Sequence, residues 1–151
     1  MQKDKEAITL RLAEKVLAFS RKDMTPRAMN VARTGIIDTI GVTLAGVPEG
    51  CTQILLRIPG VATAPGKALI FGSSRRTSAL DASLINGTAS HALDYDDFSS
   101  DFGGHQSVPL VAPLFALAEE RGANGMQVMV AYAAGLEALI RLARAVNFVH
   151  Y

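Results

Sequence analysis

Residues 105–146, HQSVPLVAPLFALAEERGANGMQVMVAYAAGLEALIRLARAV, decide the fold class of this chain. Ser107 predicts a helix N-cap, and Pro109 fits the first turn of the helix that would follow. That helix should end near Gly122, because glycine is favoured directly after a helix C-terminus. Asn124 begins a second apolar segment with the spacing of a capping box. Two long helices joined by a short connection predict helix packed on helix.

Similar signals divide most of the remaining chain into helices. Thr25 followed by Pro26 predicts a helix start, and Ser78 predicts another by its cap-like spacing to Asp81. The last helix, which begins after Asn124, has no stop signal and is expected to reach Tyr151. The expected helices cover residues 5–20, 26–44, 51–58, 79–92, 108–121 and 125–151.

One segment has a different pattern. Residues 64–72 hold a short apolar run with turn residues at both ends, which predicts a strand and at most a small β-hairpin near residues 67–77. We find no internal repeat or linker. The sequence therefore predicts one mainly helical, all-α unit over residues 1–151.

The composition limits the classes of function. Apolar residues make up 49% of the 151 residues and charged residues only 19%, so we expect apolar surface to be buried against a partner, as in a homodimer, or against further chain. The formal net charge is +1 without a long basic run, which argues against a nucleic-acid partner.

The location of the protein is predicted from absent signals. Cys51 is the single cysteine, so no intrachain disulfide can form, and we expect it to be buried. The charged N-terminus is unlike a signal peptide. The charge-free stretches 102–118 and 122–136 are too short and interrupted to predict a membrane span. A cytoplasmic protein is the expectation.

The segment NGTASHALDYDDFSSDFGGH, residues 86–105, holds a dense polar cluster. Its titratable members are His91, Asp94, Asp96, Asp97, Asp101 and His105. A solvated acidic loop is one interpretation. The interleaved Tyr95, Phe98 and Phe102 favour a second one, because aromatic side chains in a loop tend to be buried and would take the carboxylates with them. A histidine beside such carboxylates could form an acid/base pair.

A metal site is a third interpretation. His91, Asp94 and His105 could hold a divalent transition-metal ion, as in a metal-dependent hydrolase. A calcium loop is excluded on spacing, because Phe98 replaces an oxygen ligand and the required glycine and glutamate are missing.

Four segments resemble the MmgE/PrpD family in order and spacing. They are IIDTIGVTLAG (36–46), KALIFGSS (67–74), LINGTASHALDYDD (84–97) and residues 105–146. The family includes 2-methylcitrate dehydratase, cis-aconitate decarboxylase and an iminodisuccinate epimerase. Its members are much longer, usually form homodimers and work without a cofactor. The resemblance implies that this chain is the N-terminal part of the family's helical domain and is inactive alone.

The resemblance also implies roles for particular residues. Asp94 and His105 match the catalytic aspartate and histidine of a lyase acting on a small di- or tricarboxylate. Asp97 and Phe98 lie where substrate-binding residues are expected, although many members have threonine at the position of Phe98. Asp96 would modulate the pair. The alternative from a different class is a non-catalytic helical oligomerisation domain.

Overall fold

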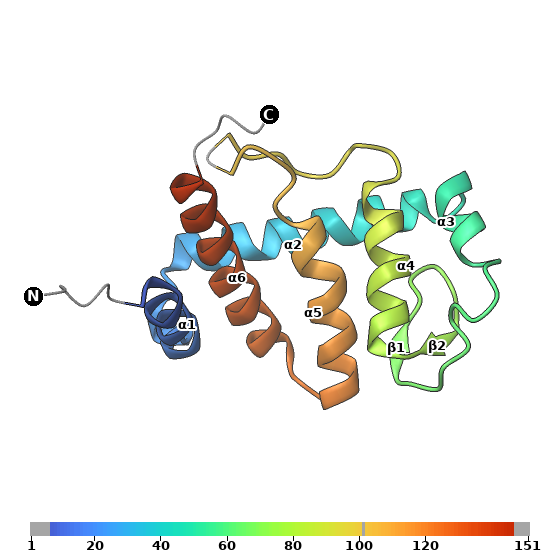
Figure 1. Cartoon of the computed structure of the whole chain (residues 1–151), viewed down its shortest axis with the longest axis horizontal. Coiled ribbons are helices and arrows are strands. Elements are labelled where there is room, and N and C mark those ends of the chain that lie inside the picture. The colour runs from blue at the N-terminus through green and yellow to red at the C-terminus, as the bar shows by residue number, and fades with distance from the viewer. Residues whose placement is uncertain (1–6, 101, 147–151) are drawn as a thin grey trace, which may run out of the picture.

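The computed structural model describes residues 7–100 and 102–146, and the expected all-α class with a small hairpin is confirmed (Figure 1). Its elements are α1 (Ile8–Ala18), the 3-10 turn η1 (Arg21–Asp23), α2 (Pro26–Gly46), α3 (Gly50–Leu55), β1 (Ala68–Leu69), β2 (Arg76–Thr77), α4 (Ala79–His91), α5 (Val108–Arg121) and α6 (Gly125–Ala145).

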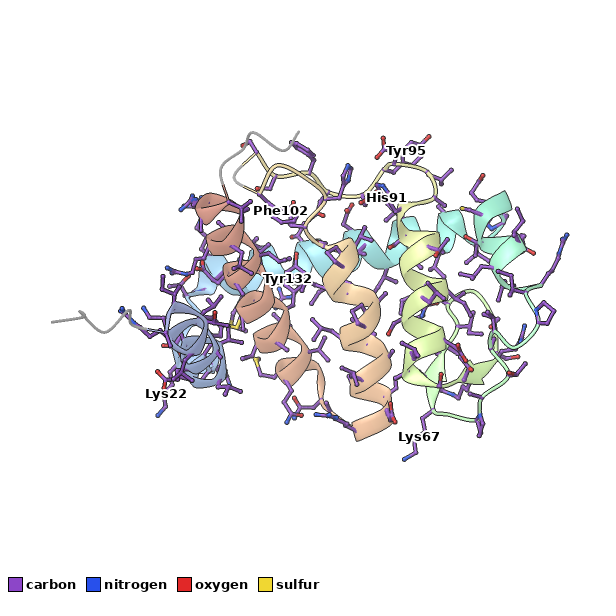
Figure 2. The ribbon with its side chains drawn as sticks, in the orientation of Figure 1. Lys22, Lys67, His91, Tyr95, Phe102 and Tyr132 are labelled. Atoms are coloured by element: carbon purple, nitrogen blue, oxygen red, sulfur yellow. The ribbon has the colours of Figure 1, made fainter. Side chains whose placement is uncertain are left out.

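Helices α4, α5 and α6 lie side by side, and α2 crosses this layer (Figure 1). The apolar core fills the junction of α2, α5 and α6, where Tyr132 is almost fully buried (Figure 2). Its buried members are Met24, Ala32, Ile36, Val111, Val128 and Tyr132. Burial of such side chains is the main favourable term in folding, so this junction anchors the layer that carries the candidate site.

Small residues allow α2 and α4 to approach closely. A Cβ atom placed on Gly46 would lie 2.0 Å from the main-chain oxygen of Ala89, a distance that no side chain could occupy. The C-terminal end of α2 is therefore held directly against the half of α4 that leads to the polar loop.

The hairpin is fixed to the helices by two polar side chains. β1 and β2 pair antiparallel. Asn86 of α4 accepts a hydrogen bond from the amide of Phe71 and donates one to the carbonyl of Leu69, both at 2.9 Å. Glu119 of α5 accepts from the amide of Leu69 at 2.6 Å and pairs with Arg76 at 3.0 Å. Buried backbone groups require such partners, so Asn86 has a structural role in its motif.

Three local expectations are corrected. Helix α6 ends at Ala145, with Val146 extended, and the predicted continuation to Tyr151 lies otherwise outside the described residues. The side chain of Ser107 does not cap α5, because its hydroxyl bonds elsewhere. Cys51 is exposed, since it occupies the outer side of the short helix α3.

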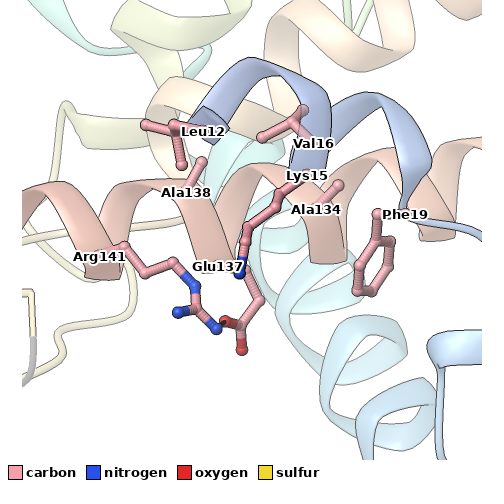
Figure 3. Close-up of a pocket in the computed structure, with 8 residues that line it drawn as sticks. All are labelled: Leu12, Lys15, Val16, Phe19, Ala134, Glu137, Ala138 and Arg141. Carbon is pink, nitrogen blue, oxygen red and sulfur yellow. Dashed lines mark ion pairs between the residues drawn. The ribbon is translucent and has the colours of Figure 1, made fainter. Parts of the chain in front are cut away.

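Helix α6 is long and apolar enough to cross a membrane by length and composition, which the charge-free stretches had not predicted. Its exposed Glu137 and Arg141 form an ion pair at 3.1 Å, and charged side chains are costly in lipid. A pocket of about 250 Å³ lies between α1 and α6, and Glu137 and Arg141 are among the residues that line it (Figure 3). It is lined mainly by apolar side chains, and no residue of the polar cluster lines it.

Candidate functional site

The polar loop lies across one end of α4 and α5 (Figure 1). Helix α4 ends at His91, as expected from the acids that follow it. Asp94 then adopts a left-handed conformation with φ of +55°. Aspartate tolerates this region better than most residues, at a cost of roughly 1 kcal/mol. This turn reverses the chain and brings Asp96 back to His91.

Asp96 lies at the centre of the loop, and its side chain has no exposed surface. Its Oδ1 atom is 2.9 Å from Nδ1 of His91, and its Oδ2 atom is 2.9 Å from Nδ1 of His105. The N–H of His105 is directed at the main-chain oxygen of Asp96, however, so Oδ2 has no well-aligned hydrogen-bond donor. The two imidazole rings contact each other edge to face with centroids 4.9 Å apart. A buried carboxylate thus positions both histidines.

The hydrogen bond to Asp96 determines the orientation of His105. A carbonyl oxygen only accepts, so Nδ1 of His105 carries a hydrogen at this 3.1 Å contact. Nε2 then faces Asp94, whose Oδ1 atom is 3.4 Å away. The structure brings together the two residues predicted as an acid/base pair. Phe98 contacts the ring of His105 at a centroid distance of 5.7 Å.

Asp97 is engaged in holding the loop on α5. Its carboxylate accepts from the amide of Ser107 at 3.1 Å, from the Ser107 hydroxyl at 2.5 Å and from the side-chain amide of Gln106 at 2.8 Å. A negative charge at a helix N-terminus is also favoured by the helix dipole. Asp97 therefore caps the N-terminus of α5, the role that the sequence predicted for the side chain of Ser107.

The chain of hydrogen bonds continues into the core. The Ser107 hydroxyl donates to Asp97, which leaves its oxygen to accept from the phenol of Tyr132 at 2.6 Å. Burial raises the pKa of Tyr132, and the carboxylates of Asp97 and Asp38 add to this rise. The loop is thereby connected to α6 through a neutral phenol.

The expected burial of the loop aromatics is wrong for two of three residues. Tyr95 and Phe98 are 73% and 65% exposed, while Phe102 is half-buried. Figure 2 shows Tyr95 at the outer rim of the loop, beyond His91. Phe98 has only an edge contact with His105, so most of its ring remains exposed. Asp101 lies outside the described residues.

Two hollows adjoin the loop. A groove of about 580 Å³ runs along α4 past Cys51 and Thr88 to His91. On the other side, a pocket of about 360 Å³ is bordered by Asp38, Asp97 and Tyr132. The sequence contains no lysine or arginine between Arg76 and Arg121, so the loop provides no cationic side chain other than its imidazoles.

Asp96 has a larger role than the sequence predicted. It was expected to modulate Asp94 and His105, whereas in the structure its carboxylate is the shared partner of both histidines. Ligand atoms of His91, Asp94, Asp96 and His105 all lie within 4.8 Å of one another, so these residues could also hold a metal ion.

The chain matches the model of a known protein family. The family model described as the MmgE/PrpD N-terminal domain matches residues 10–151. No curated protein matches the chain.

Proposed function

The chain belongs to the MmgE/PrpD family, and we propose that it supplies the acid/base half of a lyase site for a small di- or tricarboxylate. The reaction class is hydration and dehydration, as in 2-methylcitrate dehydratase. The observation that carries the proposal is the contact between Asp94 and His105, with His105 oriented by Asp96. Both candidate groups are near solvent at the mouth of the loop, where a small acid could reach them.

The geometry suits proton transfer in both directions. In dehydration, Asp94 accepts the proton from the carbon next to a substrate carboxylate. Protonated His105 donates its Nε2 proton to the hydroxyl on the neighbouring carbon, which leaves as water while the double bond forms. In hydration, the neutral ring accepts a proton from water at Nε2. The hydrogen bond from Nδ1 to Asp96 is compatible with both states of the ring.

The site as described is only half of what such a substrate needs. A di- or tricarboxylate carries several negative charges, and carboxylates are bound best by lysine, arginine or protonated histidine. The segment from 77 to 120 has no lysine or arginine. Cationic groups would have to come from another part of the protein or from a partner, which supports the proposal of a half-site.

Two measurements on the purified chain test this proposal. With 15N-labelled histidine, 2-methylcitrate or cis-aconitate should shift the resonances of His105, and the shift should disappear in Asp94→Asn but persist in the matched Asp38→Asn. Product formation by the chain alone should be undetectable. Sustained turnover would contradict the half-site, and unchanged His105 resonances with both acids would contradict the substrate class.

A second candidate function is helical oligomerisation. Among the described residues, sixteen large apolar side chains are exposed, including Ile37 of α2 and Leu80 of α4. A large total of exposed apolar side chains is typical of proteins that associate. Sedimentation velocity over a hundredfold range of concentration tests it: a homo-oligomer supports the candidate, and a monomer throughout contradicts it.

A further inference from the structure

His91 is the last residue of α4 and faces the polar loop, but the proton transfer proposed above gives it no role. Its Nδ1 atom lies 2.9 Å from Oδ1 of Asp96, whose side chain has no exposed surface. An ionised carboxylate only accepts, so Nδ1 of His91 carries a hydrogen at this contact. The other ring nitrogen, Nε2, has no hydrogen-bond partner among the described residues, and the side chain is 52% exposed. His91 therefore has one nitrogen free for a ligand.

This free nitrogen belongs to a ring that lies beside the two groups proposed for proton transfer. The rings of His91 and His105 contact each other edge to face, with centroids 4.9 Å apart. Polar side-chain atoms of His91, Asp94 and His105 lie within 4.8 Å of one another. A small acid that contacts Asp94 and Nε2 of His105 is therefore within reach of His91 as well.

The groove along α4 gives a ligand space at His91. Its volume is about 580 Å³, and most of the side chains that line it are small or apolar. Among the described residues of its lining, His91 alone can carry a positive charge. An acid that lies partly in this groove would therefore meet a single cationic group, at the end of the groove that adjoins the loop.

The buried carboxylate of Asp96 makes His91 a suitable cationic donor. A charge held away from water requires a compensating partner, and protonated His91 supplies it through Nδ1 while the Nε2–H stays available. Histidine changes its charge near neutral pH. Hydrogen bonds between a charged donor and a carboxylate are roughly twice as strong as neutral ones. The segment from 77 to 120 has no lysine or arginine, so its positive charge has to come from histidine.

We propose that Nε2 of His91 binds a carboxylate group of the substrate and makes the site selective for a charged acid over its uncharged amide. The reacting carbon and hydroxyl would lie at Asp94 and His105, and a carboxylate of the same molecule would accept the Nε2–H of His91. This inference rests on the proposed lyase function and adds a specificity-determining residue to it. The other carboxylates of a tricarboxylate would still need cations from outside the loop.

The test compares succinate with succinamide, in which uncharged amides of nearly the same shape replace both carboxylates. Binding of each compound to the purified 151-residue chain is followed through the 15N resonances of labelled histidine. The measurement is made at about pH 6, where imidazole can be protonated. We expect succinate to shift the resonances of both His91 and His105 and to bind about tenfold or more tightly than succinamide.

The variant His91→Gln keeps a donor for Asp96 but cannot carry a charge. It should weaken succinate binding by about tenfold or more and leave succinamide binding unchanged. Leu80→Gln is the matched control, because it places the same new side chain at the opposite end of α4, where Leu80 is exposed. This variant should bind both compounds as the parent chain does. The shift at His91 in the parent chain carries the test if His91→Gln does not fold.

The inference is overturned if succinate leaves the resonances of His91 unchanged, or if His91→Gln binds succinate as tightly as the parent chain. It is equally overturned if His91→Gln weakens both compounds to the same extent, which is the pattern of a histidine with a structural role only. A response at His105 without one at His91 would overturn this inference and leave the lyase proposal standing. A response at His91 alone would support the carboxylate contact and contradict the lyase proposal.

Discussion

Nδ1 of His105 lies 3.1 Å from the main-chain oxygen of Asp96, and this contact decides which nitrogen of the ring faces Asp94. The partner is a backbone atom, so substitution of the Asp96 side chain would not remove it directly. The buried carboxylate of the same residue positions His91 as well. One residue therefore orders both histidines.

Because Asp94 has a left-handed backbone conformation, two substitutions can distinguish the effect of backbone strain from the effect of losing its carboxylate. Asp94→Gly should preserve or slightly raise the free energy of unfolding, because glycine adopts a φ of +55° without a steric penalty. Asp94→Ala should lower it by about 1 kcal/mol. Urea denaturation measures both. Since each variant lacks the carboxylate, both should lose ligand responses at His105 equally; a difference between them would assign those responses to loop geometry.

Asp97 should matter more for stability than for binding. Asp97→Ala removes the acceptor for Gln106 and for two donors of Ser107, so the free energy of unfolding should fall by at least about 2 kcal/mol. Tyr132→Phe, which removes only the buried hydrogen bond between Tyr132 and Ser107, should cost about 1 kcal/mol. Thermal and urea denaturation would measure the difference. Equal effects would show that the loop is held by other contacts.

The buried phenol predicts a loss of stability at alkaline pH. The pKa of Tyr132 is raised in the folded protein above its ordinary value of 10.0, chiefly by burial. The unfolded chain therefore loses this proton first, so stability is unaffected below about pH 10 and falls as the pH rises from there towards the folded pKa. Tyr132→Phe should flatten this part of the curve in urea denaturation at pH 9 to 11. An unchanged slope would contradict the assignment.

The contact between α2 and α4 predicts opposite effects for two glycines of one helix. Gly46→Ala places a Cβ against the carbonyl of Ala89 and should lower the free energy of unfolding by about 1–3 kcal/mol or more. Gly41→Ala meets nothing within 4 Å and should raise it by roughly 0.5–1 kcal/mol through helix propensity. Denaturation of both variants provides the comparison, and a stable Gly46→Ala would show that the helices can separate.

Local signals predicted most of the fold. The hydroxyl of Thr25 accepts from the amide of Ala28, and Asn124 and Gln127 form a capping box. Both patterns depend on residues within one helical turn, so a sequence contains all that they need. The hairpin followed from turn residues in the same way, although its paired strands are only two residues long.

The site was predicted less completely, because its contacts join distant residues. The pairing of Asp94 with His105 was expected from the family pattern and is seen in the geometry. The central place of Asp96 was not, since it depends on how the loop returns to α4. Ser107 correctly predicted the start of α5. Its hydroxyl, however, forms hydrogen bonds with Asp97 and Tyr132, which lie outside that helix.

The loop also has a consequence for how related chains can diverge. Asp97 is bonded to Ser107 across the base of the loop, and Ser99 pairs with Gly104 one step further out. An insertion or deletion between Ser99 and Gly104 would change the tip of the loop without moving His105, which follows Gly104 on the fixed side. A change in loop length can therefore alter the entrance to the site without any substitution of the site residues, while His91 and His105 keep their positions.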